Sequence, residues 1–122
     1  MDTTSHIRVL LLDIGIPANF LGFIYIVYAV QLALDNSKYA FKMTKELYID
    51  VATHYHTSHI AVERCIRYAI ATGMEYGSAE LIGEIFSNSI NPKRGVPTNS
   101  QFITSLCLYI KRQQLQEPEA EQ

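Results

Sequence analysis

The sequence lacks the features that mark several large classes of protein. It has no tryptophan and only two cysteines, which lie far apart and form no Cys-x-x-Cys motif. A disulfide-rich secreted scaffold and a zinc ribbon are therefore excluded. No basic stretch leads into an apolar run at the start, so a secretory signal peptide is not predicted. We expect a cytoplasmic protein in which Cys65 and Cys107 are reduced residues of the core.

An excess of charge of either sign is absent as well. Ten lysines and arginines stand against twelve acidic residues, which gives a formal net charge of -2. The strongly basic balance that usually accompanies nucleic-acid binding is therefore missing. Part of the acidity lies in a polar tail from about residue 115, which carries Glu117, Glu119 and Glu121. Any attraction to nucleic acid would have to come from a local basic patch.

Motifs of catalysis and metal binding are also missing. There is no glycine-rich phosphate loop and no Ser/His/Asp set in a recognisable context, so neither an enzyme nor a cofactor is predicted. His54, His56 and His59 lie close together in the chain, with Glu63 one turn further on. A zinc site needs three or four convergent ligands, and these histidines straddle a predicted helix end without sharing a face. We expect no metal site.

A long uncharged run at residues 14–34 raises the question of a membrane span. Pro17 and Asn19 confine a helix there to roughly 16 residues, or about 24 Å, which is shorter than the hydrocarbon of a bilayer. Gln31 interrupts the run near its end. A helix that is apolar nearly all round is also typical of a buried core helix. We therefore predict a core helix and no contact with a membrane.

The apolar spacing predicts an all-α protein, with about six helices around one core in a single domain of residues 1–122. Gly15 is expected to end the first helix, and Pro17 lies where the next could begin. Thr98 and Gln101 form a capping box at the start of the last helix. The expected helices cover residues 5–14, a stretch ending near 34, 44–55, a stretch from 58 that ends at Gly73 or Gly77, 78–86 and 98–114.

The two central helices carry the strongest functional signal. Residues 44–55 and the helix after Ser58 are separated only by residues 56–58, which fits a central helix-turn-helix. At about 100° per residue, one face of the second helix is apolar. The opposite face carries Ile60, Glu63, Arg64, Arg67 and Ala71. An ordinary amphipathic helix with a solvated charged face has the same spacing, so periodicity alone leaves both interpretations open.

Four blocks of sequence resemble one known family. They are VERCIRYAI at residues 62–70, IGIPA at 14–18 with Gly22 and Tyr25 behind it, LIGEIF at 81–86, and PTNSQFI at 97–103. In their order along the chain, these blocks are similar to the effector domain of the stage 0 sporulation protein A response regulators of endospore-forming bacteria. The specific blocks are VERCIRYAI and PTNSQFI, and the other two are mostly apolar patterning.

The resemblance implies a transcription regulator that binds double-stranded DNA through the second central helix. At the matching positions, Glu63 and Arg64 would read base edges, since arginine suits the two acceptors of guanine and glutamate the amino group of cytosine. Further residues would contact or approach phosphates: Ser58, His59 and Arg67, with Lys93 and Arg94 in a basic loop. The resemblance also implies tandem recognition boxes bound by two copies, a homodimer on DNA, with RNA polymerase as a further partner.

The sequence departs from the family pattern in three places. Ala61 replaces an arginine just before Val-Glu-Arg, which should weaken binding because one cation is lost from the edge of the groove. Leu21, Val27 and Tyr28 replace charged residues, which indicates either tighter packing or an apolar face for self-association. No part of the chain resembles the phosphoacceptor receiver domain, so control by phosphorylation is not implied. The alternative is a non-catalytic interaction module of the same fold that binds a regulator or RNA polymerase through the apolar second helix.

Overall fold

A computed structural model describes residues 2–36, 39, 45–86 and 95–116 of the chain. These residues form helices joined by turns, and none of them lies in a β-strand. The predicted all-α class and the number of helices are confirmed. The helices are α1 Thr3–Ile14, α2 Leu21–Asp35, α3 Lys45–His54, α4 His59–Tyr76, α5 Ala79–Phe86 and α6 Asn99–Gln116.

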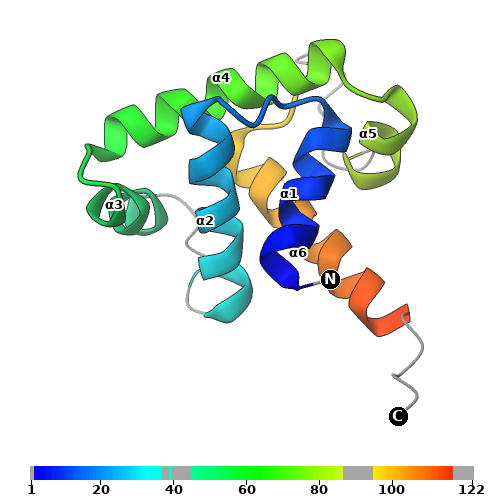
Figure 1. The fold of residues 1–122 in the computed structure, drawn as a ribbon, viewed down its shortest axis with the longest axis horizontal. Coiled ribbons are helices and arrows are strands. Elements are labelled where there is room, and N and C mark those ends of the chain that lie inside the picture. The colour runs from blue at the N-terminus through cyan, green and yellow to red at the C-terminus, as the bar shows by residue number, and fades with distance from the viewer. Residues whose placement is uncertain (1, 37–38, 40–44, 87–94, 117–122) are drawn as a thin grey trace.

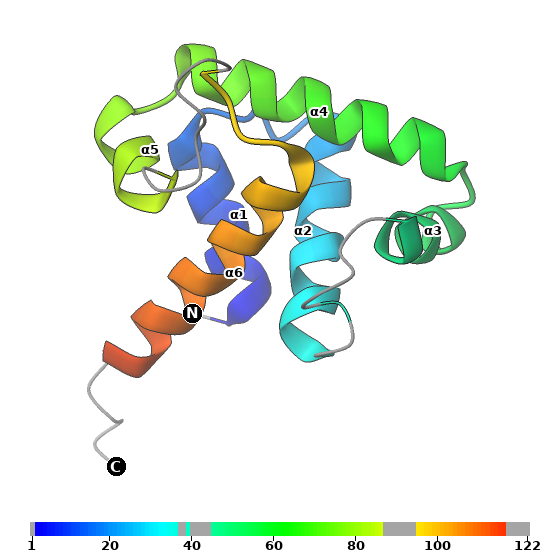
Figure 2. The ribbon, with the colours of Figure 1, turned by 180° about the vertical axis from the view of Figure 1, so that it is seen from behind.

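Helix α4 lies along one edge of the molecule, and the other helices lie to one side of it (Figure 1). Helices α1 and α2 run away from it, while α3 and α5 lie near its two ends. The view from behind shows α6 on the far side of α1 and α2 (Figure 2). In both views no described helix covers the outer side of α4. One long face of this helix is therefore open to solvent or to a partner.

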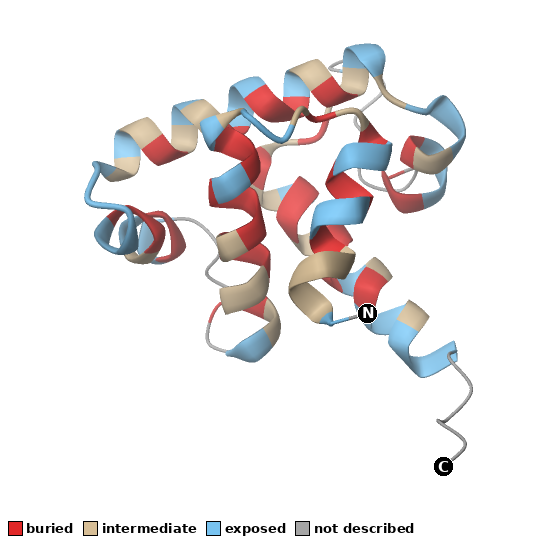
Figure 3. Ribbon diagram, viewed as in Figure 1, coloured by how far each residue is buried: buried red, intermediate tan, exposed pale blue. Residues whose placement is uncertain are grey.

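Helix α2 is the central helix of the core, as its uncharged sequence predicts. It packs against α1, α3, α4 and α6, and Phe23, Ile26 and Val30 on it are at most 2% exposed. Figure 3 shows buried residues along most of its length. Within the described residues, no helix has both the length and the hydropathy needed to cross a membrane.

Helix α1 begins at Thr3, two residues before the expected start, and two further boundaries involve residues singled out in the sequence. Helix α2 begins at Leu21 rather than at Pro17, because the chain first makes a turn in which the Phe20 N–H donates to the Pro17 carbonyl at 3.2 Å. This turn follows Ile16, which is buried, so the linker is held on the core before the chain reverses. Gly73 does not end α4 but lies buried inside it, and the helix continues to Tyr76. The Gly77 N–H then donates to the Gly73 carbonyl at 2.8 Å.

Three of the expected helix caps are present. Gly15 adopts φ 105° after α1, and its N–H donates to the Leu11 and Leu12 carbonyls. A left-handed residue of this kind closes a helix most easily when it is glycine. The capping box also forms, since the Thr98 N–H donates to the Gln101 side chain at 2.9 Å and the Gln101 N–H to the Thr98 hydroxyl at 3.1 Å. The Ser78 hydroxyl accepts from the Leu81 N–H at 3.3 Å at the start of α5.

The apolar residues of α2 that depart from the family pattern are mostly packed inside. Val27 is 6% exposed, and the Tyr28 ring stacks on His54 with ring centroids 4.1 Å apart. Tighter packing is therefore the explanation for these two positions. Leu21 remains exposed, together with Ile24 on the next turn. The apolar face that self-association would use is thus smaller than the sequence indicates.

Candidate nucleic-acid interface

The turn between α3 and α4 is short and is held by several backbone hydrogen bonds. The Thr57 N–H donates to the Ala52 carbonyl at 2.9 Å, and the His56 N–H donates to the Thr53 carbonyl at 3.4 Å. His56 adopts φ 57°, so the turn is a Schellman ending in which a histidine takes the place usually held by glycine. Ser58 then caps α4 by accepting from the Ala61 N–H at 3.1 Å. These bonds fix the direction in which α4 leaves α3.

Packing divides α4 into an inner and an outer face. Val62, Ile66 and Ala69 are fully buried against α2 and α3, whereas Arg64, Arg67 and other outer residues are exposed (Figure 3). Cys65, expected in the core, is only half-buried. It lies at the border of the two faces because α2 covers this side of α4 incompletely. Cys107 on α6 is buried as expected, and burial raises the pKa of its thiol to about 11.

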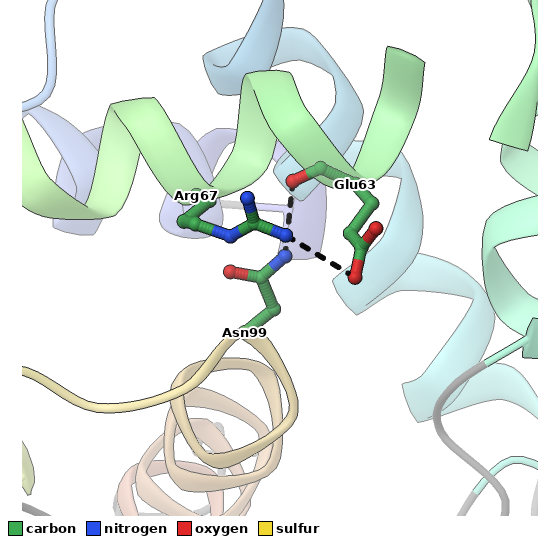
Figure 4. A network of polar contacts seen from close by, with 3 residues as sticks. All are labelled: Glu63, Arg67 and Asn99. Atoms are coloured by element: carbon green, nitrogen blue, oxygen red, sulfur yellow. Dashed lines mark hydrogen bonds and ion pairs between the residues drawn. The ribbon is translucent and has the colours of Figure 1, made fainter. Parts of the chain in front are cut away.

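On one side of the outer face, Glu63 and Arg67 form an ion pair (Figure 4). The Arg67 Nη2 lies 3.3 Å from the Glu63 Oε2, and the two side chains are 63% and 44% exposed. A solvent-exposed pair at this helical spacing contributes only about 0.3–0.5 kcal/mol to stability. Its main effect is therefore to hold the carboxylate in one orientation on the surface.

This ion pair borders a groove of about 520 Å³ between α4, α3 and the start of α6. Tyr48 of α3 contributes to its wall, and burial raises the pKa of the Tyr48 hydroxyl. Asn99, the first residue of α6, is 8% exposed. Its Nδ2 donates to the backbone carbonyl of Glu63 at 3.1 Å (Figure 4). The polar residues of this side thus come from all three helices.

Arg64 lies on the other side of the outer face. It lines a smaller groove of about 330 Å³ together with residues of the α2 start and of α4: Phe20, Leu21, Gly22, Cys65 and Tyr68. The Phe20 and Tyr68 rings stack here with centroids 5.4 Å apart. Within the described part of the chain, the Arg64 guanidinium has no ion-pair partner. The trio that shares one face in the sequence is therefore divided, with Glu63 and Arg67 paired and Arg64 apart from them.

The remaining predicted contact residues are placed as follows. Ser58 and His59 lie at the start of α4, where the unpaired N–H groups of a helix favour anions. Ser58 is exposed and His59 is half-buried. Ala61 is half-buried, and the neighbouring Ile60 is 51% exposed. Lys93 and Arg94 lie outside the described residues.

The three clustered histidines take up separate positions. His54 is exposed and contacts two aromatic rings, with Tyr28 stacked on it and Tyr55 edge-on to it at a centroid distance of 4.7 Å. His56 forms the turn and His59 begins α4. In the described ranges, no three His, Cys, Asp or Glu side chains come together in a way that would hold a metal ion.

Sequence reasoning missed two residues beside this surface. Tyr68 is 67% exposed on the outer face of α4, and it was not among the predicted contact residues. Asn99 belongs to the PTNSQFI block that carries part of the family resemblance, but no role is predicted for it. Its position was available from the sequence, because Asn99 precedes Phe102 and Leu106 on the inward face of the last helix. A polar residue in an apolar stripe signals a specific hydrogen bond.

A comparison with known protein families gives one match over most of the chain. Residues 7–110 match the family described as "Sporulation initiation factor Spo0A C terminal". The matched range contains α2 to α5 completely, most of α1 and α6, and every residue of the candidate interface. It also includes the four blocks that carry the resemblance seen in the sequence. The chain therefore belongs to the family of sporulation initiation factor Spo0A C-terminal domains.

Proposed function

We propose that this protein binds double-stranded DNA in a sequence-specific manner and regulates transcription, with α4 as the recognition helix. The observation that carries the proposal is the uncovered outer face of α4, where Arg64 and the Glu63–Arg67 pair are exposed next to a capped, short turn. Membership of the sporulation initiation factor family supports the same function. An α-helix fits the width of the DNA major groove, and its N-terminal half contacts the bases.

Each residue of the interface has a role in this mechanism. The exposed Arg64 guanidinium donates two hydrogen bonds to O6 and N7 of a guanine. The Glu63 carboxylate, oriented by Arg67, accepts from the amino group of a cytosine. Ser58 accepts from the Ala61 N–H through its oxygen, so its hydroxyl hydrogen can still donate to a phosphate. His59, Arg67, Lys93 and Arg94 complete the proposed contacts to the DNA backbone.

Because the protein has no net positive charge, we expect its affinity for DNA to rest on a small number of phosphate and base contacts. Each phosphate neutralised by a cation adds about 0.9 to the slope of log affinity against log salt. With a net charge of -2, the long-range attraction is weak. We therefore expect a shallow salt dependence and a large share of the affinity from base contacts. A second copy on an adjacent recognition box, and RNA polymerase, are the proposed protein partners.

Fluorescence anisotropy would test the proposal. The wild type is titrated with a duplex carrying the recognition box of the family and with a scrambled duplex of equal composition, across a salt series. Arg64→Ala should weaken binding to the box by about 1–3 kcal/mol and reduce the preference over the scrambled duplex. The control is Arg112→Ala, which removes the same charge from the part of α6 that points away from α4 (Figure 2). It should change neither the affinity for the box nor the preference over the scrambled duplex.

The result that contradicts the proposal is weak binding that is equal for both duplexes and unchanged by Arg64→Ala. The alternative function, a protein-interaction module that binds a regulator or RNA polymerase, would then be preferred. On α2 such a module would have to use Leu21 and Ile24, because Val27 is buried and Tyr28 is half-buried.

A further inference from the structure

Asn99 is a buried polar residue at a junction of three helices. It is the first residue of α6, 8% exposed, and its side chain points at α4 (Figure 4). Its Nδ2 donates to the Glu63 carbonyl at 3.1 Å across 36 positions of sequence. Its side chain lines the same groove as Tyr48 of α3, and it lowers the pKa of the Tyr48 hydroxyl against the larger opposing effect of burial. One amide is therefore bonded to α4 at the place where α3, α4 and α6 meet.

Capping of α6 does not require this side chain. Asparagine near a helix start commonly caps the free N–H groups of the first turn. Here Thr98 and Gln101 already do this, through two reciprocal hydrogen bonds. The Asn99 amide is thus available for a contact outside its own helix. Burying an amide without hydrogen-bond partners costs free energy, so the buried Asn99 side chain needs a partner outside α6.

The acceptor of this bond lies in the turn of α4 that is proposed to contact DNA. The Glu63 carbonyl belongs to the turn that carries Glu63, Arg64 and Arg67. In a helix this carbonyl already accepts from the N–H four residues on, and its second lone pair is free for another donor. The bond from Asn99 therefore adds a fixed point between α6 and the base-reading turn. A helix held in this way can neither rotate about its axis nor slide along it without losing the bond.

We propose that Asn99 is a positioning residue for DNA recognition, which sets the rotation and depth of α4 by holding the Glu63 carbonyl. The inference rests on the proposed function of the α4 face. Asn99 itself does not touch the bases in this role. It acts through Glu63 and Arg67, whose side chains extend from the turn that it holds. Its loss should therefore lower discrimination between DNA sequences more than it lowers general DNA binding.

The test compares Asn99→Ala and Asn99→Asp with Ile103→Val. Alanine removes the amide, and aspartate keeps the shape but replaces the Nδ2 donor with an acceptor. Ile103 is fully buried one turn further along α6, so its substitution weakens the packing of the same helix without removing a polar contact. The readout is the ratio of dissociation constants for the scrambled and box duplexes. It is measured at a temperature where helical circular dichroism is unchanged, with amide hydrogen exchange across residues 59–67.

The expected result is a ratio that falls about tenfold in both Asn99 variants, as the loss of one buried hydrogen bond would produce. Hydrogen exchange in residues 59–67 should become faster in them, while Ile103→Val keeps the wild-type ratio. The inference is overturned if the folded Asn99 variants keep that ratio. It is also overturned if both unfold at every assay temperature, since Asn99 would then support the fold as a whole. A wild type that does not distinguish the duplexes refutes the proposed function itself, which is a separate outcome.

Discussion

The crossing of α2 over α4 depends on a single glycine. A Cβ atom added at Gly22 would lie 2.2 Å from the Cys65 carbonyl oxygen and 2.7 Å from the Ala69 Cβ. Ordinary van der Waals contact begins near 3.4 Å, so Gly22→Ala would force the two backbones apart by about 1 Å. Neither neighbour is the flexible end of a side chain that could move aside. The strain must therefore be taken up by the helices themselves.

The size of the effect follows from two opposing contributions. Overpacking of a well-packed core costs about 1–3 kcal/mol, and contact with backbone atoms points to the upper end of that range. Alanine gains about 1 kcal/mol over glycine in a helix, which offsets part of the cost. We expect Gly22→Ala to lower the free energy of unfolding by about 2 kcal/mol. It should also weaken DNA binding, because the displaced segment of α4 includes Cys65, next to Arg64.

Gly83 provides the matched control. It lies inside α5 and is exposed, and an added Cβ there would meet nothing within 4 Å. Gly83→Ala should therefore raise the free energy of unfolding by about 0.5–1 kcal/mol, from helix propensity alone. Urea unfolding followed by circular dichroism measures both variants. If Gly22→Ala is as stable as Gly83→Ala, the close approach of α2 and α4 at this glycine is refuted.

Two further predictions concern the turn and the pH dependence. His56→Gly should keep or raise the free energy of unfolding measured in urea, whereas His56→Val should lower it by about 1–2 kcal/mol. The reason is that φ 57° strains a β-branched residue most. Equal stability of the two variants would contradict this prediction. The hydrogen bond to Asp50 raises the pKa of Tyr39 to about 12, so its stabilisation is complete below pH 10 and is lost as the pH rises toward 12. Thermal unfolding of wild type and Tyr39→Phe over this range should show a smaller loss in the variant, and parallel curves would exclude the linkage.

The helices and their caps could be predicted because their signals are local. Thr98 and Gln101 are three residues apart, and Gly15 follows directly after the apolar residues of α1. Each of these signals depends on atoms within one turn of helix, so no knowledge of the rest of the chain is needed. The start of α2 at Leu21, four residues after the expected Pro17, is not set by a local signal. It depends on how the linker after Ile16 packs on the core, which the local sequence does not contain.

The arrangement of the candidate site could be predicted only in part. Periodicity placed Glu63, Arg64 and Arg67 on one face, and all three are indeed at least partly exposed. It did not show that Arg64 borders α2 while the Glu63–Arg67 pair borders α6. Which neighbour covers each flank of a helix is decided by tertiary packing. Their roles on DNA stay predictions, as does the contribution of Lys93 and Arg94.

The two flanks of α4 indicate where the proposed sequence specificity would come from in a protein with no net positive charge. On one flank Gly22 lets the backbone of α2 touch that of α4, and on the other Asn99 holds the Glu63 carbonyl. A readout residue must be held to within a fraction of an ångström, and rigid helices hold it better than loops. Because long-range attraction is weak at a net charge of -2, an error in the position of α4 would not be masked by non-specific binding. The backbone contact falls on Cys65, next to Arg64, and the hydrogen bond falls on Glu63 itself, so both flanks of α4 are held at the turn that is proposed to read the bases.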